Sequence, residues 1–282
     1  MSIWLITGAS RGFGLEITRA ALAEGHQVAA TARDTTALSS AFPDAGDALF
    51  ALPLDVTDEA RAKAAVAEAV ERFGGIDVLV NNAGHGMLGA VEEVGDAAAR
   101  AVFDTNVFGT LNVLRAVLPV MRARRSGHVI TITSVGGFDG VAGWGLYAAT
   151  KFAMEGFSES LRRETEPLGV QVPIVEPGYF RTDFLDASSL RREETVIADY
   201  AATVGVSRER ALRSNHAQPG DPVKAARVIV GLGQHPDAPH RLQLGADAVV
   251  RVEAKLDQMR DELATWREVS LSTDHDDVVP GV

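Results

Sequence analysis

The sequence predicts an α/β protein with a doubly wound parallel sheet and helices on both faces. Short apolar runs alternate along the 282 residues with longer, Ala-rich stretches of helical period. The apolar runs are continuous rather than alternating in polarity, as expected of strands that are covered on both faces. This succession of strands and helices is typical of a parallel sheet with right-handed crossovers.

Seven strands are expected, at residues 2–7, 27–32, 49–54, 78–81, 128–133, 171–176 and 241–244. Helices are expected at residues 12–24, 58–73, 96–124, 147–166, 221–232 and 246–268. Asp58 and Asp221 are suited to be N-caps, with Pro222 at the favoured first helical position. Pro173 removes a backbone donor inside the sixth strand, which puts the pairing there in doubt.

Two regions depart from this alternation. Residues 179–220 form a long polar connection after the sixth strand, which predicts a lid or binding element. We therefore expect a single domain over residues 1–269 that contains this lid, followed by a flexible acidic tail at 270–282. Trp266 is expected to anchor the last helix to the body of the domain.

Composition excludes several functions. The net charge of −11 argues against a nucleic-acid or anionic-membrane binder, because such proteins need clustered Lys and Arg. The chain contains no cysteine, which excludes disulfides and thiolate metal sites and fits a reducing compartment. No apolar stretch approaches the roughly 20 residues of a membrane span, and no signal peptide is recognisable. We expect a cytoplasmic protein with no metal, since no His, Asp and Glu cluster has ligand spacing.

A glycine-rich turn follows the first strand and opens the first helix. Its sequence is TGASRGFG at residues 7–14, and its glycines permit a tight turn and close approach of backbone to a ligand. The helix N-terminus would present free N–H groups to a pyrophosphate. The expected cofactor contacts here are Gly8, Ser10, Arg11, Gly12, Phe13 and Gly14.

The end of the second strand favours NADP(H) over NAD(H). An acidic residue at this point selects NAD, whereas an Arg accommodates the additional phosphate of NADP. Here the strand ends at Ala32 and Arg33 follows, while Arg11 could reach the same phosphate. Asp34 either caps a turn or bonds a ribose hydroxyl.

Tyr147 and Lys151 stand one turn apart on a predicted helix and so share a face. A phenol is a poor acid or base at neutral pH until a nearby cation stabilises its anion, which an ammonium can do. Ser134 follows a predicted buried strand, at the sheet edge where open α/β sheets bind ligands. Together these residues indicate acid–base chemistry beside a bound cofactor.

With these residues, the chain resembles the short-chain dehydrogenase/reductase family from about residue 2 to residue 244. The resemblance also rests on Asp55, Asn81-Asn82-Ala83-Gly84, Asn106 and Pro177-Gly178, in the order and spacing of the family. It implies a Rossmann-type domain with a seven-stranded sheet, an NAD(P)(H) cofactor, and oxidation of alcohols or reduction of carbonyls. The lid and the last helix are similar to the 17β-hydroxysteroid and retinol dehydrogenase subgroup.

The resemblance also implies roles for individual residues. Tyr147 would be the general acid or base, Lys151 would lower its pKa and bond the nicotinamide ribose, and Ser134 would polarise the substrate oxygen. Asn106 would hold a water in a proton relay, unless it is only a structural hydrogen-bonding residue. The further cofactor contacts would be Asp55, Val56, Asn82, Ala83, Gly84, Pro177, Gly178 and Thr182, the last of which could instead cap the lid.

The residues expected to meet the substrate are mostly apolar, which favours a hydrophobic substrate. They are His85, Gly136, Phe138, Trp144, Phe180 and Phe184. We expect an oxidoreductase that transfers hydride between NADP(H) and a hydrophobic ketone, aldehyde or secondary alcohol. A nucleotide-sugar dehydratase or epimerase, or a non-catalytic NADP(H)-sensing module, are the alternatives. A homodimer or homotetramer through the helices at 96–124 and 147–166 is expected.

Overall fold

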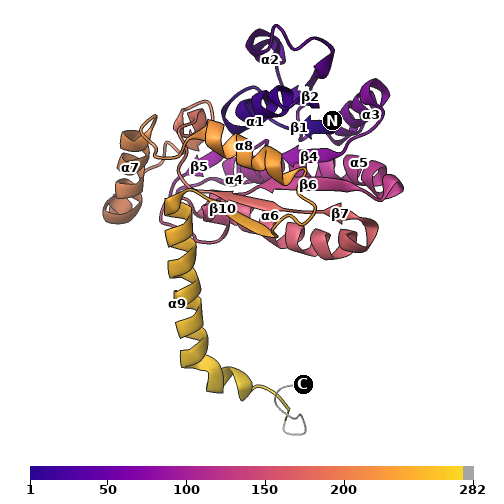
Figure 1. Ribbon diagram of the computed structural model, residues 1–282. Coiled ribbons are helices and arrows are strands. Elements are labelled where there is room, and N and C mark those ends of the chain that lie inside the picture. The colour runs from indigo at the N-terminus through magenta and orange to yellow at the C-terminus, as the bar shows by residue number, and fades with distance from the viewer. Residues whose placement is uncertain (276–282) are drawn as a thin grey trace.

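The computed structural model describes residues 1–275, and its centre is a parallel sheet with helices on both faces (Figure 1). The strands follow the order β10-β8-β6-β4-β1-β2-β3, with the short β7 beside β6. Their bounds are β1 (Ile3–Ile6), β2 (Gln27–Ala32), β3 (Leu49–Pro53), β4 (Val78–Asn81), β6 (Gly127–Ile132), β7 (Val170–Gln171), β8 (Ile174–Pro177) and β10 (Arg241–Leu244). The predicted doubly wound, Rossmann-type fold is confirmed.

The sixth predicted strand is interrupted at Pro173. β7 pairs with the start of β6, and β8 pairs with its end and with β10. The two pieces occupy one place in the sheet, so the eight strands of the sheet fill seven positions. The missing N–H of Pro173 explains the gap in the ladder, while its carbonyl still accepts from Thr131 N at 3.1 Å.

Residues 1–275 contain nine α-helices. They are α1 (Gly12–Ala23), α2 (Thr36–Ala41), α3 (Glu59–Phe73), α4 (Asp96–Phe103), α5 (Gly109–Arg124), α6 (Gly145–Thr165), α7 (Val206–Ser214), α8 (Pro222–Leu232) and α9 (Ala246–Leu271). Trp4 and Ile6 of β1 pack under α1 and α8, whereas Leu5 packs with α3 and α5. The continuous apolar runs are therefore buried on both faces, as predicted.

Local signals position several helices. Asp58 accepts a hydrogen bond from Arg61 N at 2.9 Å, and Asp221 accepts one from Val223 N at 2.9 Å, so both predicted N-caps are confirmed. The helix predicted at 96–124 is divided by one π-helical segment, η2 (Asp104–Phe108), which joins α4 to α5. This wider turn contains Asn106.

The predicted lid, 179–220, contains short elements that the sequence did not reveal. Its strand β9 (Leu190–Arg192) pairs in parallel with β5 (Gly86–Leu88), which follows β4. The buried carboxylate of Glu93 holds the lid to this region, since it accepts from Ile197 N at 2.9 Å and pairs with Arg208. The lid is thus attached at two points to the segment that follows β4.

Helix α9 extends away from the rest of the molecule (Figure 1). All residues from 256 to 275 are exposed, and Trp266 is 62% exposed, so the expectation that Trp266 anchors this helix is wrong. The helix continues to Leu271, two residues into the predicted tail, and residues 276–282 lie outside the described residues. Across residues 1–275, none of the helices combines the length and apolarity needed to cross a membrane.

Candidate active site

The glycine turn is held against the end of β4. Asn82 donates through its side chain to the carbonyls of Thr7 at 2.9 Å and Gly8 at 3.1 Å. Gly8 has a φ of +64°, which favours glycine, and a Cβ there would lie 2.9 Å from Ala83 Cα. A Cβ at Gly14 would lie 2.3 Å from the Gly8 carbonyl oxygen, so glycine is required for the turn to close on the helix.

The first turn of α1 is open to an anion. Arg11 occupies the N-cap position but makes no capping hydrogen bond with its side chain, and no acidic residue lies in the first turn. The N–H groups at this helix end therefore have no side-chain partner, and the positive end of the helix dipole faces the cleft. This is the arrangement that a pyrophosphate group requires, so the turn fits a dinucleotide.

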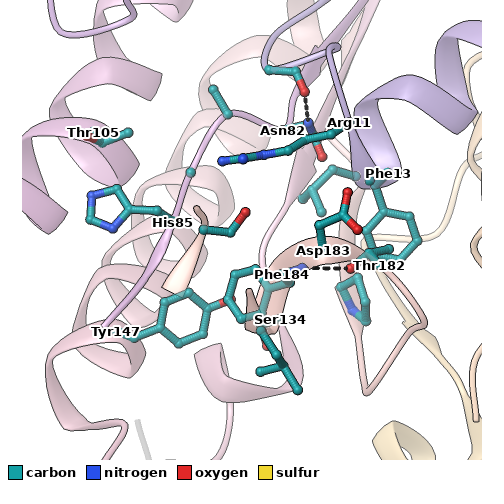
Figure 2. Close-up of a pocket in the computed structure, with 18 of the residues that line it drawn as sticks. Arg11, Phe13, Asn82, His85, Thr105, Ser134, Tyr147, Thr182, Asp183 and Phe184 are labelled. Atoms are coloured by element: carbon teal, nitrogen blue, oxygen red, sulfur yellow. Dashed lines mark hydrogen bonds between the residues drawn. The ribbon is translucent and has the colours of Figure 1, made fainter. Parts of the chain in front are cut away.

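A large cleft, of about 1000 Å³, runs from this turn to Tyr147. Most residues predicted for cofactor and substrate line it, and Figure 2 shows a group of them. Those lining it are Gly8, Ser10, Arg11, Gly12, Phe13, Arg33, Asp55, Val56, Asn82, Ala83, Gly84, His85, Ser134, Gly136, Trp144, Tyr147, Lys151, Pro177, Gly178, Phe180, Thr182 and Phe184.

Three predicted residues are absent from this lining. Gly14 is buried in the contact between turn and helix. Phe138 packs instead against Val135 and the base of α9. Asn106 is fully buried and lies behind the cleft wall. For Phe138 the substrate-lining expectation is therefore wrong, because its ring turns toward α9.

Asn106 and His85 are joined by two hydrogen bonds. The Asn106 side chain accepts from His85 N and donates to His85 O, both at 3.0 Å, and it also donates to Thr150 Oγ1 at 3.1 Å. The amide is thus committed to fixing the loop after β4. Burial lowers the pKa of His85, and its Nε2 has no hydrogen-bond partner within the described chain.

Arg33 and Arg11 have different surroundings in the part of the cleft near the end of β2, where the adenosine of a cofactor is expected. Arg33 is exposed at the end of β2 and lines the cleft. Asp34 also lines the cleft, and its Oδ1 accepts from Thr36 N at 2.9 Å, so this carboxylate caps a turn. Arg11 donates to the carbonyl of Ser188 in the lid at 2.8 Å, which places its guanidinium across the cleft (Figure 2).

Tyr147, Ser134 and Lys151 meet at the other end of the cleft. Burial raises the pKa of the Tyr147 phenol well above its usual range, and a hydrogen bond with Ser134 opposes that rise. Burial lowers the pKa of Lys151 to about 8, and Glu155 opposes that fall. The Lys151 ammonium donates to the carbonyl of Ile132 at 3.0 Å and lies 5.8 Å from the centre of the Tyr147 ring.

Aromatic rings enclose the Tyr147 phenol. The centre of the Phe184 ring lies 5.4 Å from that of Tyr147, and Trp144 meets Tyr147 edge-on at 5.8 Å. Figure 2 shows Phe184 of the lid directly beside Tyr147 and Ser134. Phe180, in contrast, packs 5.1 Å from Phe13 at the cofactor end. The apolar surface at the Tyr147 end of the cleft thus comes from Trp144 and Phe184.

Some lining residues were not found from the sequence. They include Tyr179, Asp183, Arg191 and Gln218 of the lid, together with Asp139 and Arg251. The lid also brings Asp183, Asp186 and His216 together, with their possible ligand atoms within 4.8 Å of one another. The cluster could not be found from the sequence because His216 lies 30 residues after Asp186. Asp186 also accepts hydrogen bonds from Asn215 and His216. The absence of a metal therefore stays a prediction.

The fold and the site define a nucleotide-binding α/β oxidoreductase, and comparison with known proteins gives the family. A profile of the short chain dehydrogenase family matches residues 2–193. Oxidoreductase BOA17 of Botryotinia fuckeliana is 37% identical over 272 residues, which cover 96% of this chain and 98% of that protein. Retinol dehydrogenase 8 of Homo sapiens is 43% identical over 190 residues, covering 64% of this chain and 59% of that protein. The chain belongs to the short-chain dehydrogenase/reductase family, with relatives of the retinol dehydrogenase type.

Solved structures agree with this assignment. A short-chain dehydrogenase from Streptomyces avermitilis is 43% identical, with a TM-score of 0.88 over 97% of this chain and 100% of that one. A serine dehydrogenase complexed with NADP+ is 29% identical, with a TM-score of 0.73 over 86% of this chain and 94% of that one. A Burkholderia phymatum family member in complex with NAD shares the fold at 22% identity and a TM-score of 0.81, over 99% and 98% of the two chains. The family is one of NAD(P)-dependent enzymes that act on CH–OH and carbonyl groups.

Proposed function

We propose that the protein is an NADP(H)-preferring oxidoreductase of hydrophobic ketones, aldehydes or secondary alcohols. The observation that carries this proposal is the position of the Tyr147 phenol, which lies beside Ser134 and under the rings of Trp144 and Phe184. A carbonyl oxygen placed there would meet two hydroxyl groups, while the rest of the substrate would meet apolar surface. Trp144 and Phe184 supply apolar surface at this end, which favours a hydrophobic substrate.

The preference for NADP(H) is supported by charge at the end of β2. Ala32 leaves no carboxylate at the strand end, and the Asp34 side chain is engaged by Thr36. Arg33 is exposed beside the cleft, where it can meet a phosphate on the adenosine ribose. Arg11 could add a second guanidinium on exchanging its bond to the Ser188 carbonyl.

The bound nicotinamide supplies the hydride acceptor or donor. In carbonyl reduction, the Tyr147 hydroxyl gives its proton to the substrate oxygen, and in alcohol oxidation the phenolate takes the proton back. Ser134 donates a hydrogen bond to the same oxygen and so holds it beside Tyr147. The Lys151 ammonium, 5.8 Å from the centre of the Tyr147 ring, is placed to stabilise the phenolate, and the hydrogen bond with Ser134 offsets part of the pKa rise caused by burial. Asn106 contributes by fixing the His85 backbone at the edge of the cleft.

The two alternatives have less support. The relatives named by the comparisons are oxidoreductases and dehydrogenases, which favours neither a dehydratase or epimerase nor a sensor. A sensing module would also have no need for Tyr147, Ser134 and Lys151 together at one end of the cleft.

The test is consumption of NADPH by the purified protein over a panel of hydrophobic ketones and aldehydes, with NADH in parallel. We expect turnover with at least one panel member, faster with NADPH at equal concentration. A panel of charged keto acids serves as the matched comparison and should turn over poorly. Equal rates with both cofactors would reject the cofactor preference. Bound NADPH without turnover of any carbonyl would reject the reductase and favour the sensor.

A further inference from the structure

The lid strand β9 places an arginine, Arg191, in the lining of the large cleft. Successive side chains of a strand point to opposite faces, so Arg191 points away from the face that Leu190 and Arg192 share. Leu190 packs with Leu88 and Leu185 on that other face. Of the three residues of β9, Arg191 is the one that lines the cleft. The lid therefore contributes a cation to the cleft wall.

The Arg191 side chain is exposed and has no anionic partner in the part of the chain that the structure describes. Within residues 1–275 it forms no ion pair with Asp or Glu. Arg208 of the same lid is, in contrast, held by the buried carboxylate of Glu93. Since the chain has a net charge of −11, an unpaired arginine in a cleft is uncommon here and is free to meet an anionic ligand.

Arg191 lies in the same part of the cleft as Arg33. Burial is the main cause of the lowered pKa of His85, and the positive charges of Arg191 and Arg33 add to it. Both guanidiniums are therefore near this ring, although Arg33 follows β2 and Arg191 belongs to the lid. Arg11 reaches the same lid segment, because it donates to the Ser188 carbonyl at 2.8 Å. Three separate segments thus bring arginines to one region.

Two carboxylates, Asp34 and Asp55, also line the cleft beside Arg33, but both have other partners. Asp34 accepts from Thr36 N at 2.9 Å, and Asp55 accepts from Thr57 N at 3.0 Å and from Thr57 Oγ1 at 2.7 Å. Like charges in one cleft repel one another, and an anion placed between them removes that repulsion. The arrangement suits a ligand group with two negative charges and several oxygens.

We propose that Arg191 binds the phosphate on the adenosine ribose of NADP(H) together with Arg33, so that the lid takes part in the choice of cofactor. This inference rests on the proposed preference for NADP(H). The pyrophosphate has its own donors in the free N–H groups of α1, whereas the ribose phosphate is expected at the end of β2, beside Arg33. A phosphate has three terminal oxygens and can accept from two guanidiniums at once.

The contact would also couple the position of the lid to the bound cofactor. Strand β9 has three residues and pairs only with β5 among the described strands, and a two-stranded sheet of this size has little stability of its own. Strand β5 is fixed to the body, because Met87 is buried with Val102 and Tyr147. A phosphate held by both Arg33 and Arg191 links β9 to the opposite wall of the cleft. NADP(H) should therefore hold β9 in place more firmly than NAD(H).

The first test is fluorescence titration of Arg191→Ala with NADPH and with NADH. We expect the Kd for NADPH to rise about 10-fold and that for NADH to stay within about two-fold of wild type. Arg191→Lys keeps the charge but loses the planar fork, so its loss should be intermediate. Arg192→Ala is the matched control, because Arg192 is the next residue of the same strand, is exposed, and does not line the cleft.

The second test follows the lid without any turnover, by hydrogen–deuterium exchange of the peptide that contains residues 187–193. In wild-type protein, saturating NADPH should slow exchange in this peptide more than saturating NADH does, because only NADPH links β9 to Arg33. The difference between the cofactors should disappear in Arg191→Ala and persist in Arg192→Ala. Persistence of the full difference in Arg191→Ala would contradict the coupling.

The titrations also separate failure of this inference from failure of the proposed function. If wild-type protein prefers NADPH and Arg191→Ala keeps that preference, the role of Arg191 is rejected and the cofactor preference stands. If Arg191→Ala weakens both cofactors equally, Arg191 meets the pyrophosphate or supports the lid, and the ribose phosphate is not its ligand. If wild-type protein binds NADPH and NADH equally, the cofactor preference itself is rejected, and the role of Arg191 with it.

Discussion

Arg241 on β10 donates a hydrogen bond to Glu155 on α6 at 3.0 Å, and this ion pair lies one helical turn beyond Lys151. Glu155 also accepts from Thr133 Oγ1 at 2.6 Å, while Arg241 lies 3.4 Å from the buried Glu176. Burial raises the pKa of both carboxyls, and the guanidinium opposes that rise. One guanidinium therefore pairs with both buried carboxylates behind the Tyr147 end of the cleft.

Arg241→Leu should reduce the stability of the protein strongly. Loss of one partner of a buried ion pair leaves uncompensated charge, and we expect the free energy of unfolding to fall by about 3 kcal/mol. Arg163→Leu is the matched control, because Arg163 pairs with Glu159 at 3.2 Å at an exposed site and should cost less than about 1 kcal/mol. Urea unfolding at pH 7 measures both. Similar losses in the two variants would refute a special role for Arg241.

Lys151→Met should increase stability while removing activity. Burial of the ammonium lowers its pKa from 10.5 to about 8, so its charged form costs free energy in the folded state. Without that cost, the free energy of unfolding at pH 7 should rise by on the order of 2 kcal/mol. A decrease in stability at pH 7 would contradict this account of Lys151.

Wild-type protein and Lys151→Met also test how the free energy of unfolding depends on pH. Between about pH 8 and 10.5, the unfolded chain binds a proton at Lys151 that the folded chain has lost. The contribution of Lys151 to stability therefore becomes more favourable as pH rises through this window. The stability gained by Lys151→Met should accordingly shrink from pH 7 to pH 10, as measured by urea unfolding. If the stability gained by Lys151→Met does not change with pH, the lowered pKa of Lys151 is not its cause.

Arg33→Ala should weaken binding of NADPH about 10-fold or more and leave that of NADH nearly unchanged, because only NADPH offers a phosphate to this guanidinium. Arg19→Ala on α1 is the control, since Arg19 pairs with Glu16 outside the cleft. Fluorescence titration of both cofactors gives the ratio. Equal weakening of NADPH and NADH in Arg33→Ala would reject the role.

Phe184→Ala should raise the KM for bulky apolar ketones by about 10-fold, because the ring contributes apolar contact beside Tyr147. Phe152→Ala is a suitable control, since Phe152 is 47% exposed and lies outside the cleft lining. Steady-state kinetics on a small and a bulky ketone separate the two effects. An equal change for both ketones would indicate damage to the site rather than loss of substrate contact.

The central fold and the grouping of Ser134, Tyr147 and Lys151 at one cleft could be predicted from local sequence. Buried parallel strands read as continuous apolar runs, and the glycine turn and the Tyr147–Lys151 spacing are short-range patterns. Even the break at Pro173 follows from a missing N–H group. Each of these features is decided within a few residues of chain.

Features that depend on distant contacts could not be predicted. The strand β9 forms because the lid pairs with β5, which lies about 100 residues earlier in the sequence. No local pattern predicts that pairing. The direction of the Phe138 ring depends on where α9 packs. The expectation for Trp266 is wrong because α9 contacts the body only near Ala248 and Val252, and the course of a helix beyond such an anchor cannot be predicted from its own sequence.

The most direct test of the proposed chemistry is substrate-dependent oxidation of NADPH by wild-type protein, Tyr147→Phe and Tyr200→Phe. Tyr200 is half-buried, bonds Glu92 at 2.6 Å and lies far in sequence from Tyr147, so it controls for loss of a phenol. Removal of the general acid should lower kcat at least about 100-fold in Tyr147→Phe, with NADPH affinity within about two-fold of wild type. Tyr200→Phe should keep full activity. Retention of most of the activity by Tyr147→Phe would contradict the proposed chemistry.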